Sequence, residues 1–96
     1  MKLLSVVPAH DGIHKLAATF ETDSGRTKTT KFGSAGATDY LKSKEPDRRE
    51  RYRSRHAKDL QTNDPTRAGF LSWHLLWGSS TLLSHNIRAY KRKFGL

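Results

Sequence analysis

The most chemically capable part of this sequence is a run of arginines between residues 48 and 55. Five of these eight positions are arginine, although lysine would serve solubility equally well. A guanidinium group binds phosphate or carboxylate through two parallel hydrogen bonds, so the composition favours a binding surface for an anionic partner. The candidate residues in this run are Arg48, Arg49, Arg51, Arg53 and Arg55.

A solvated helix surface is the alternative interpretation of the same run. Asp47, Glu50 and Asp59 are spaced to pair with several of the arginines along a helix, and such exposed pairs contribute little to stability. The clustering and a pI near 10.3 are instead typical of nucleic-acid binders, so both interpretations stay open. Further candidate cations for partner or nucleic-acid binding are Lys58, Arg67, Arg88, Lys91, Arg92 and Lys93.

The other polar side chains form no recognisable catalytic or metal site. His10 and His14 have a spacing that binds zinc on a helix, but they flank Gly12 in a predicted turn and no further ligand is in sight. A solvated turn is the favoured interpretation. Because the serines, histidines and acids are scattered without a triad or paired carboxylates, we expect no enzyme activity, no metal, no cofactor and no small-molecule substrate.

Length and composition restrict the class of protein. The chain has 96 residues, a formal net charge of +9 and no cysteine, so disulfides, thiolate zinc sites and cysteine nucleophiles are excluded. The size predicts a single domain, residues 1–96. No apolar run approaches the roughly 20 residues of a membrane span, so we expect none. The charge predicts an anionic neighbour: nucleic acid, acidic protein or anionic lipid.

The first third of the chain has the alternation of β-strands. Leu3 to Val7 is short, β-branched and ends before Pro8, which predicts an edge strand whose partner the sequence leaves open. Residues 15–22 alternate apolar and polar, and residues 27–32 return after a turn around Gly25, which predicts a hairpin. Residues 1–36 are therefore the predicted β part, and the Gly-rich segment after it is a linker.

Residues 37–96 are predicted to form the helical part. Tyr52, His56 and Leu60 give one helix, from Pro46 to about Leu60, a narrow apolar face. A central helix over residues 65–77, capped by Asp64 and stopped at Gly78, carries both tryptophans and is expected to be wrapped by the rest of the chain. The last helix has an apolar stripe and ends at Gly95. The stripe consists of Leu83, Ile87, Tyr90 and Phe94. The predicted class is α+β: a small antiparallel hairpin or three-stranded sheet followed by three helices.

Four blocks of this sequence resemble a family of short basic proteins of unassigned function from large nucleocytoplasmic DNA viruses, including phycodnaviruses. The blocks read KFGSAGATDYL, EPDRRERYRSRHAKDL, DPTRAGFLSWHLLWG and NIRAYKRKFGL, in that order, between residues 22 and 96. The resemblance implies a viral product packaged in the virion and present in the infected host cell. It transfers no catalytic residues.

Two functions follow from charge and resemblance together. The first is a non-enzymatic structural component of the virion, a minor capsid or capsid-associated protein that docks on acidic surfaces of capsid or other virion proteins. The second is sequence-nonspecific binding of DNA, in which the same basic helices neutralise phosphates. The two expectations differ in their response to salt, because each phosphate contact on a duplex adds about 0.9 to the logarithmic salt slope.

Overall fold

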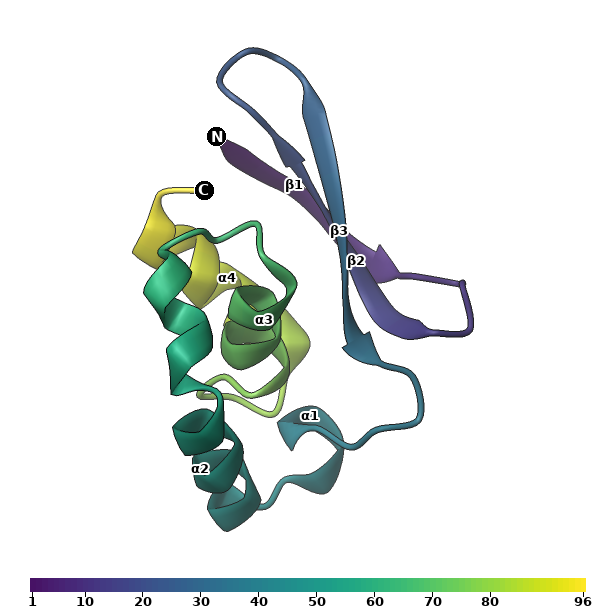
Figure 1. The fold of residues 1–96 in the computed structure, drawn as a ribbon, viewed down its shortest axis with the longest axis vertical. Helices are drawn as coiled ribbons and strands as arrows, with labels where there is room; N and C mark the ends of the chain where they lie inside the picture. The colour runs from purple at the N-terminus through teal and green to yellow at the C-terminus, as the bar shows by residue number, and fades with distance from the viewer.

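A three-stranded antiparallel sheet followed by helices makes up the fold, as the sequence predicts. The computed structural model describes all residues, 1–96. The strands β1 (Lys2–Pro8), β2 (His14–Glu21) and β3 (Thr27–Ser34) pair in the order β1-β2-β3, and both pairs are antiparallel (Figure 1). The first strand, whose partner the sequence leaves open, pairs with β2 of the same chain.

Apolar side chains on one face of the sheet form its contact with the helices. Ala18, Phe20 and Phe32 are at most 1 % exposed, and Leu3 pairs opposite Phe20 across β1 and β2. The alternation that predicts the hairpin thus directs these residues to one side, because successive side chains of a strand point to opposite faces. The other face carries Lys31 and the paired hydroxyls of Thr19 and Thr29.

The helical part contains more segments than the three predicted helices. Asp39 caps the first, because its carboxylate accepts a hydrogen bond from the Lys42 amide (3.0 Å). The segments are α1 (Tyr40–Ser43), α2 (Pro46–Arg55), the 3₁₀ helix η1 (Ala57–Thr62), α3 (Ala68–Leu71), the π-helix η2 (Ser72–Leu76) and α4 (Leu83–Phe94). The predicted helix from Pro46 therefore ends five residues early, and its last turns tighten into η1.

The central helix starts later than predicted and widens midway. The Asp64 carboxylate accepts from the Thr66 amide (2.9 Å) and hydroxyl (2.7 Å), so it closes a turn and does not cap the helix. The helix begins at Ala68 as α3 and continues as η2, in which Trp77 N bonds the Ser72 carbonyl five residues back (3.1 Å).

The wrapping expected of the central helix is confirmed. Its buried side chains belong to one hydrophobic cluster that includes the sheet residues and Tyr90 of α4. These are Phe70, Leu71, Leu75, Leu76 and Trp77. Trp73 is half-buried. All four residues of the predicted stripe on α4 pack in or against the same cluster.

Asn86 joins the end of η2 to the start of α4. Its amide nitrogen donates to the Leu75 carbonyl (3.0 Å) and the Ser80 carbonyl (2.9 Å), and its oxygen accepts from the Ser80 amide (3.0 Å). Gly78 lies against this side chain, so close that an added Cβ would sit 2.8 Å from it. The first turn of α4 has no side-chain cap.

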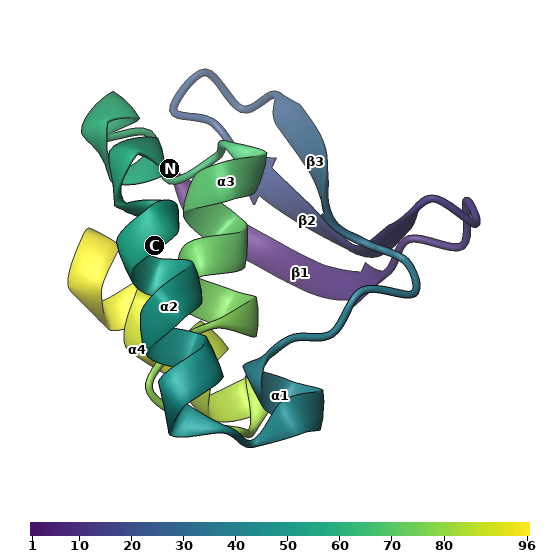
Figure 2. The same cartoon turned by 60° about the horizontal axis from the view of Figure 1, so that its bottom comes forward.

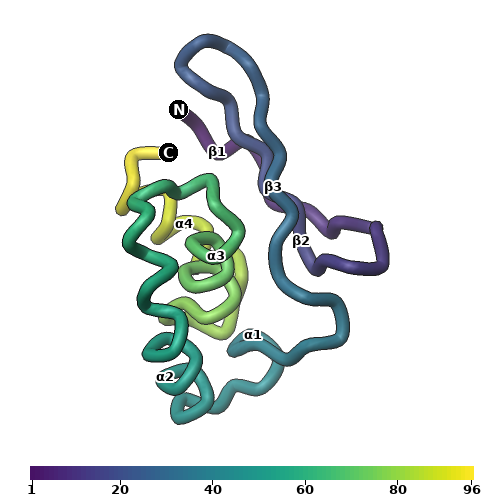
Figure 3. The backbone as a smooth tube through the Cα atoms, in the orientation of Figure 1, coloured from purple at the N-terminus to yellow at the C-terminus, as the bar shows by residue number.

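The helices cover one face of the sheet and leave the other uncovered (Figures 1 and 2). Leu4, Val7 and Ile13 are among the exposed apolar side chains of the β part. The backbone trace in Figure 3 shows that residues after β3 swing away from the sheet before they reach α1. This detour separates α2 from β3. No helix has the length and apolar character needed to cross a membrane.

A basic cleft between the sheet and the second helix

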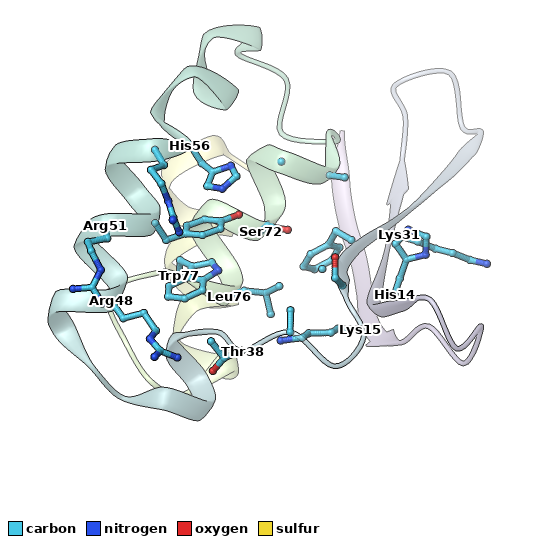
Figure 4. Close-up of a pocket in the computed structure, with 18 residues that line it drawn as sticks. His14, Lys15, Lys31, Thr38, Arg48, Arg51, His56, Ser72, Leu76 and Trp77 are labelled. Carbon is cyan, nitrogen blue, oxygen red and sulfur yellow. The ribbon is translucent and has the colours of Figure 1, made fainter.

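A cleft of about 680 Å³ separates the end of β3 from α2. Figure 4 shows Arg48 and Arg51 on the α2 side, Lys15 and His14 on the sheet side, and Leu76 and Trp77 of the central helix between them. The volume is within the roughly 300–1,000 Å³ range of ligand-binding clefts in proteins. The detour of the chain between β3 and α1 therefore produces a concave surface whose walls come from segments far apart in the sequence.

The charged residues that line the cleft are all cationic. No aspartate or glutamate is among the lining residues. The cations are Lys15, Lys31, Arg48, Arg51 and Arg55, and two histidines, His14 and His56, lie beside them. Since no acidic side chain lines the cleft, an anion bound there meets no like charge on either wall.

Three of these cations are neutralised by carboxylates of the same chain. The buried Lys15 amine lies 2.5 Å from Oδ2 of Asp39, which is 2 % exposed. The Lys31 amine is 3.5 Å from Asp11, and Figure 4 shows it directed away from α2. Arg48 pairs at 3.1 Å with the exposed Glu45 one turn earlier. These three groups leave little charge free for a partner.

Arg51 and Arg55 are the free cations of the cleft. Both are exposed, and neither makes an ion pair or a side-chain hydrogen bond within the chain. They lie four residues apart on α2, so their side chains leave the same face of the helix. The structure thus holds two planar donor groups on one face of α2 with no carboxylate to satisfy them, and such groups can bind an anionic group of a partner.

Stacked rings form the α2 side of the cleft floor. The Tyr52 ring lies between His56 (centroids 4.2 Å apart) and Trp77 (4.4 Å), nearly parallel to both. Burial is the main cause of a raised pKa of the Tyr52 hydroxyl. Because both faces of Tyr52 are covered and Phe32 is 1 % exposed, neither ring offers a free face on which a nucleic-acid base would stack.

Arg49 and Arg53 do not face the cleft, contrary to the expectation that all five arginines of this helix bind a partner. Arg49 Nε donates to the Gly78 carbonyl (2.6 Å) and Arg53 Nη1 to the Trp77 carbonyl (2.9 Å). The Arg53 guanidinium also lies 3.6 Å above the Trp73 ring. Both therefore cap the carboxyl end of the central helix, where cations are favoured, and burial lowers the pKa of Arg53.

The remaining candidate cations lie outside the cleft. Arg67 is exposed and 3.6 Å from Asp64. Lys93 lines a smaller hollow of about 180 Å³ together with Arg53 and Trp73. The residues that are exposed and make no ion pair are Lys58, Arg88, Lys91, Arg92 and Lys93. The structure thus divides the predicted basic surface into the cleft, a separate group on α4, and the single residues Lys58 and Arg67 elsewhere.

The histidines have local roles in the structure. The Asp11 carboxylate accepts hydrogen bonds from the Ile13 amide (2.9 Å) and the His14 amide (2.7 Å), which closes the predicted turn. These bonds, that from His14 first, lower the pKa of Asp11. His74 lies among Phe70, Trp73 and aromatic residues of α4, and burial lowers its pKa to about 4.

Sequence reasoning did not nominate Lys15 or Lys31 for this site. Lys15 precedes Leu16 and Lys31 precedes Phe32. Because side chains alternate along a strand, the sequence assigns both lysines to the face of the sheet opposite these apolar residues. One signal was available for the two inward arginines: Arg49 and Arg53 are four residues apart and flank the stripe that begins at Tyr52. No pattern in the sequence indicates that β3 and α2 lie across a cleft.

The fold and the cleft define a small basic α+β protein whose helices cover one face of a three-stranded sheet. The chain belongs to DUF5754, a family of unknown function, whose match extends over residues 4–56. This span includes α2 and the sheet except the first two residues of β1, and with them every cation that lines the cleft. No curated protein and no solved structure shows significant similarity to the chain.

Proposed function

We propose that this protein is a non-enzymatic docking module that binds an acidic surface of a partner protein in the cleft between β3 and α2. The observation that carries the proposal is the pair of unpaired, exposed guanidinium groups of Arg51 and Arg55 in a cleft lined by no carboxylate. Carboxylates and phosphates are the groups that such paired donors bind best.

A polypeptide partner is favoured over single-stranded nucleic acid by the floor of the cleft. Sites for single strands combine a positive groove with aromatic faces on which bases stack. Tyr52 is stacked on both sides, and Phe32 and Trp77 are buried, so among the rings that line the cleft only the half-exposed His56 is left for a base to stack on. The free guanidinium groups of Arg51 and Arg55 are instead suited to bind the carboxylate side chains of a polypeptide.

The setting that we propose is the virion, with a capsid protein as the partner. The support for this part is the resemblance of four sequence blocks to short basic proteins of large DNA viruses, and the cleft adds nothing to it. Identification of the protein in purified particles, at a fixed ratio to the capsid protein, is the measurement that tests the setting.

Titration of purified protein with a glutamate-rich peptide tests the docking itself. We expect binding that is lost in the double variant Arg51→Ala plus Arg55→Ala. The double variant Lys91→Ala plus Arg92→Ala is the matched control, because it removes the same charge from α4 and should retain binding. Equal loss in both variants would show that net charge, and not the cleft, holds the peptide.

Binding of nucleic acid is a second candidate function, and α4 favours it. No aspartate or glutamate occurs after Asp64, so the exposed cations of α4 meet no carboxylate side chain in the last third of the chain. These are Arg88, Lys91, Arg92 and Lys93. A fragment of duplex DNA should then bind with a steep salt dependence, and the Lys91→Ala plus Arg92→Ala variant should reduce the slope by about 0.9 for each phosphate that the variant no longer binds.

A further inference from the structure

The wall of the cleft opposite α2 is the edge of a strand, not its face. Four consecutive residues of β3, Lys31 to Ser34, line the cleft. Successive side chains of a strand point to opposite faces, so a cavity on one face would contact alternate residues only. A cavity that contacts every residue lies along the backbone edge.

The hydrogen-bond register shows which backbone groups point to that edge. Thr22 N donates to the Arg26 carbonyl (2.7 Å), which makes residues 22 and 26 a hydrogen-bonded pair. Hydrogen-bonded and non-hydrogen-bonded pairs alternate along an antiparallel ladder. In the register of β2 and β3, the next hydrogen-bonded pairs are therefore residues 20 with 28, 18 with 30 and 16 with 32. The N–H and C=O groups of residues 29 and 31 therefore point away from β2, and so does the N–H of Gly33, because the Phe32 carbonyl of the same peptide unit points toward β2. The alternation ends at Gly33, where φ is +75° and Ala35 N bonds the Ile13 carbonyl (2.8 Å).

These outward groups have no partner in the protein. No backbone hydrogen bond joins residue 29, 31 or 33 to the helical part, and the side-chain bonds between β3 and the loop before α3 come from Lys28 and Thr30. A free strand edge is a template for pairing with another extended chain. At Lys31 and Gly33 this template opens into the cleft.

We infer that the cleft binds its acidic partner as an extended segment that adds a fourth strand to β3. The inference rests on the proposed function, and it specifies the partner's conformation. An added strand lies about 4.8 Å from β3, and its side chains point alternately to the two faces of the extended sheet. Those on the face that the helices cover point toward α2. Arg51 and Arg55 then donate to carboxylates while Lys31 and Gly33 bond the backbone, which is the strand-addition mode of peptide recognition.

The dimensions of the two walls agree with this mode. Lys31 to Ser34 spans about 10 Å at the rise of a strand. Arg48 to Arg55 spans about 10 Å at the rise of an α-helix. Both walls therefore match an extended segment of three or four residues, with acidic side chains at alternate positions.

A pair of peptides separates strand addition from attraction by charge alone. The first is a short extended peptide with glutamate at alternate positions. The second has the same sequence but carries N-methyl groups on the backbone amides of the residues between the glutamates. The charges are the same, but the methylated peptide cannot pair with a strand edge. We expect the methylated peptide to bind about tenfold more weakly or worse, as expected for the loss of at least one or two backbone hydrogen bonds.

Proline substitution tests the same point from the protein side. Lys31→Pro removes an outward N–H in the cleft, whereas Thr29→Pro removes an outward N–H on the same edge outside it. Lys31→Ala is the control for the lost charge. Lys31→Pro should bind about five- to tenfold more weakly than Lys31→Ala, and Thr29→Pro should bind as the wild type does.

Amide hydrogen exchange reports the pairing even where a proline variant fails to fold. In the wild-type complex, exchange at Lys31 and Gly33 should slow, with no change at Thr29. Equal binding of both peptides together with unchanged exchange overturns strand addition and leaves the docking module in place. Failure of both peptides to bind, with tight binding of DNA, overturns the docking proposal itself.

Discussion

Replacement of Arg53 by alanine should destabilise the fold, whereas replacement of Arg51 should leave it unchanged. The two residues lie two positions apart in α2 and carry the same charge. Arg53 bonds the Trp77 carbonyl at 2.9 Å and lies 3.6 Å over Trp73, whereas Arg51 is exposed and makes no such contact. The pair therefore isolates the structural role of one guanidinium from its charge.

The magnitude follows from the two interactions that the substitution removes. A carbonyl left without its donor costs about 1–3 kcal/mol where it is buried, and a partly desolvated cation–π contact contributes about 1 kcal/mol. Water reaches a half-buried site, so the lower part of that range applies and we expect a loss of about 2 kcal/mol. In a domain of this size, such a loss lowers Tm by about 10 °C. Arg51→Ala should stay within about 0.5 kcal/mol of the wild type.

Urea denaturation followed by circular dichroism measures both effects, and Arg53→Lys refines them. Lysine retains the charge but lacks the planar guanidinium that lies over Trp73 and the fixed geometry of its N–H donors. The stability of this variant should therefore lie between those of wild type and Arg53→Ala. Equal midpoints for Arg53→Ala and wild type would refute the role of Arg53 as a cap of the central helix. A comparable loss in Arg51→Ala would refute the division of this helix into an inward and an outward set of arginines.

Three further predictions test other parts of the structure. Asn86→Ala leaves the Leu75 carbonyl and the Ser80 amide and carbonyl without the side chain that bonds them. Urea denaturation should therefore show a free energy of unfolding lower by about 3 kcal/mol. An unchanged midpoint would contradict the role of Asn86 in joining η2 to α4. Because the pKa of His74 is lowered from 6.5 to about 4, the unfolded chain binds more protons between these values. The free energy of unfolding should therefore fall as the pH is lowered from 6.5 to 4, and His74→Phe should fall less steeply when stability is measured across that range. Gly33→Ala should lower the free energy of unfolding by about 2 kcal/mol in thermal unfolding, because φ is +75° and the new Cβ would lie 2.7 Å from Leu76. Gly36→Ala, where φ is +85° but no atom lies near the new Cβ, should cost less. Equal losses would mean that backbone strain alone matters.

Local patterns in the sequence predict most of the fold. The stripe of α4 places Ile87 and Tyr90 in the core, and the alternation of β2 places Phe20 there, because each pattern has the period of its element. Boundaries were less predictable. Asp64 and Pro65 have the form of a helix start, but Thr66 offers the Asp64 carboxylate two donors in a turn, and this local competition delays the helix.

The candidate site was only partly predictable, because it depends on how distant segments are placed. The sequence indicates a basic surface on the helix from Pro46, and the structure finds Arg51 and Arg55 there. It does not indicate that the ends of α2 and β3 face each other, since the path of the linker between them decides this. Nor does charge density alone separate Arg53, which bonds a carbonyl, from Arg51, which remains free.

The two tryptophans line different hollows of the surface, and this gives the molecule two built-in spectroscopic probes. Trp77 lines the large cleft, whereas Trp73 lies beneath Arg53 at the smaller hollow. With each indole replaced in turn by phenylalanine, the fluorescence of the other would report one hollow alone. Occupation of the cleft by a peptide and loosening of the α2 contact could thus be followed separately, each in its own variant and without an added dye.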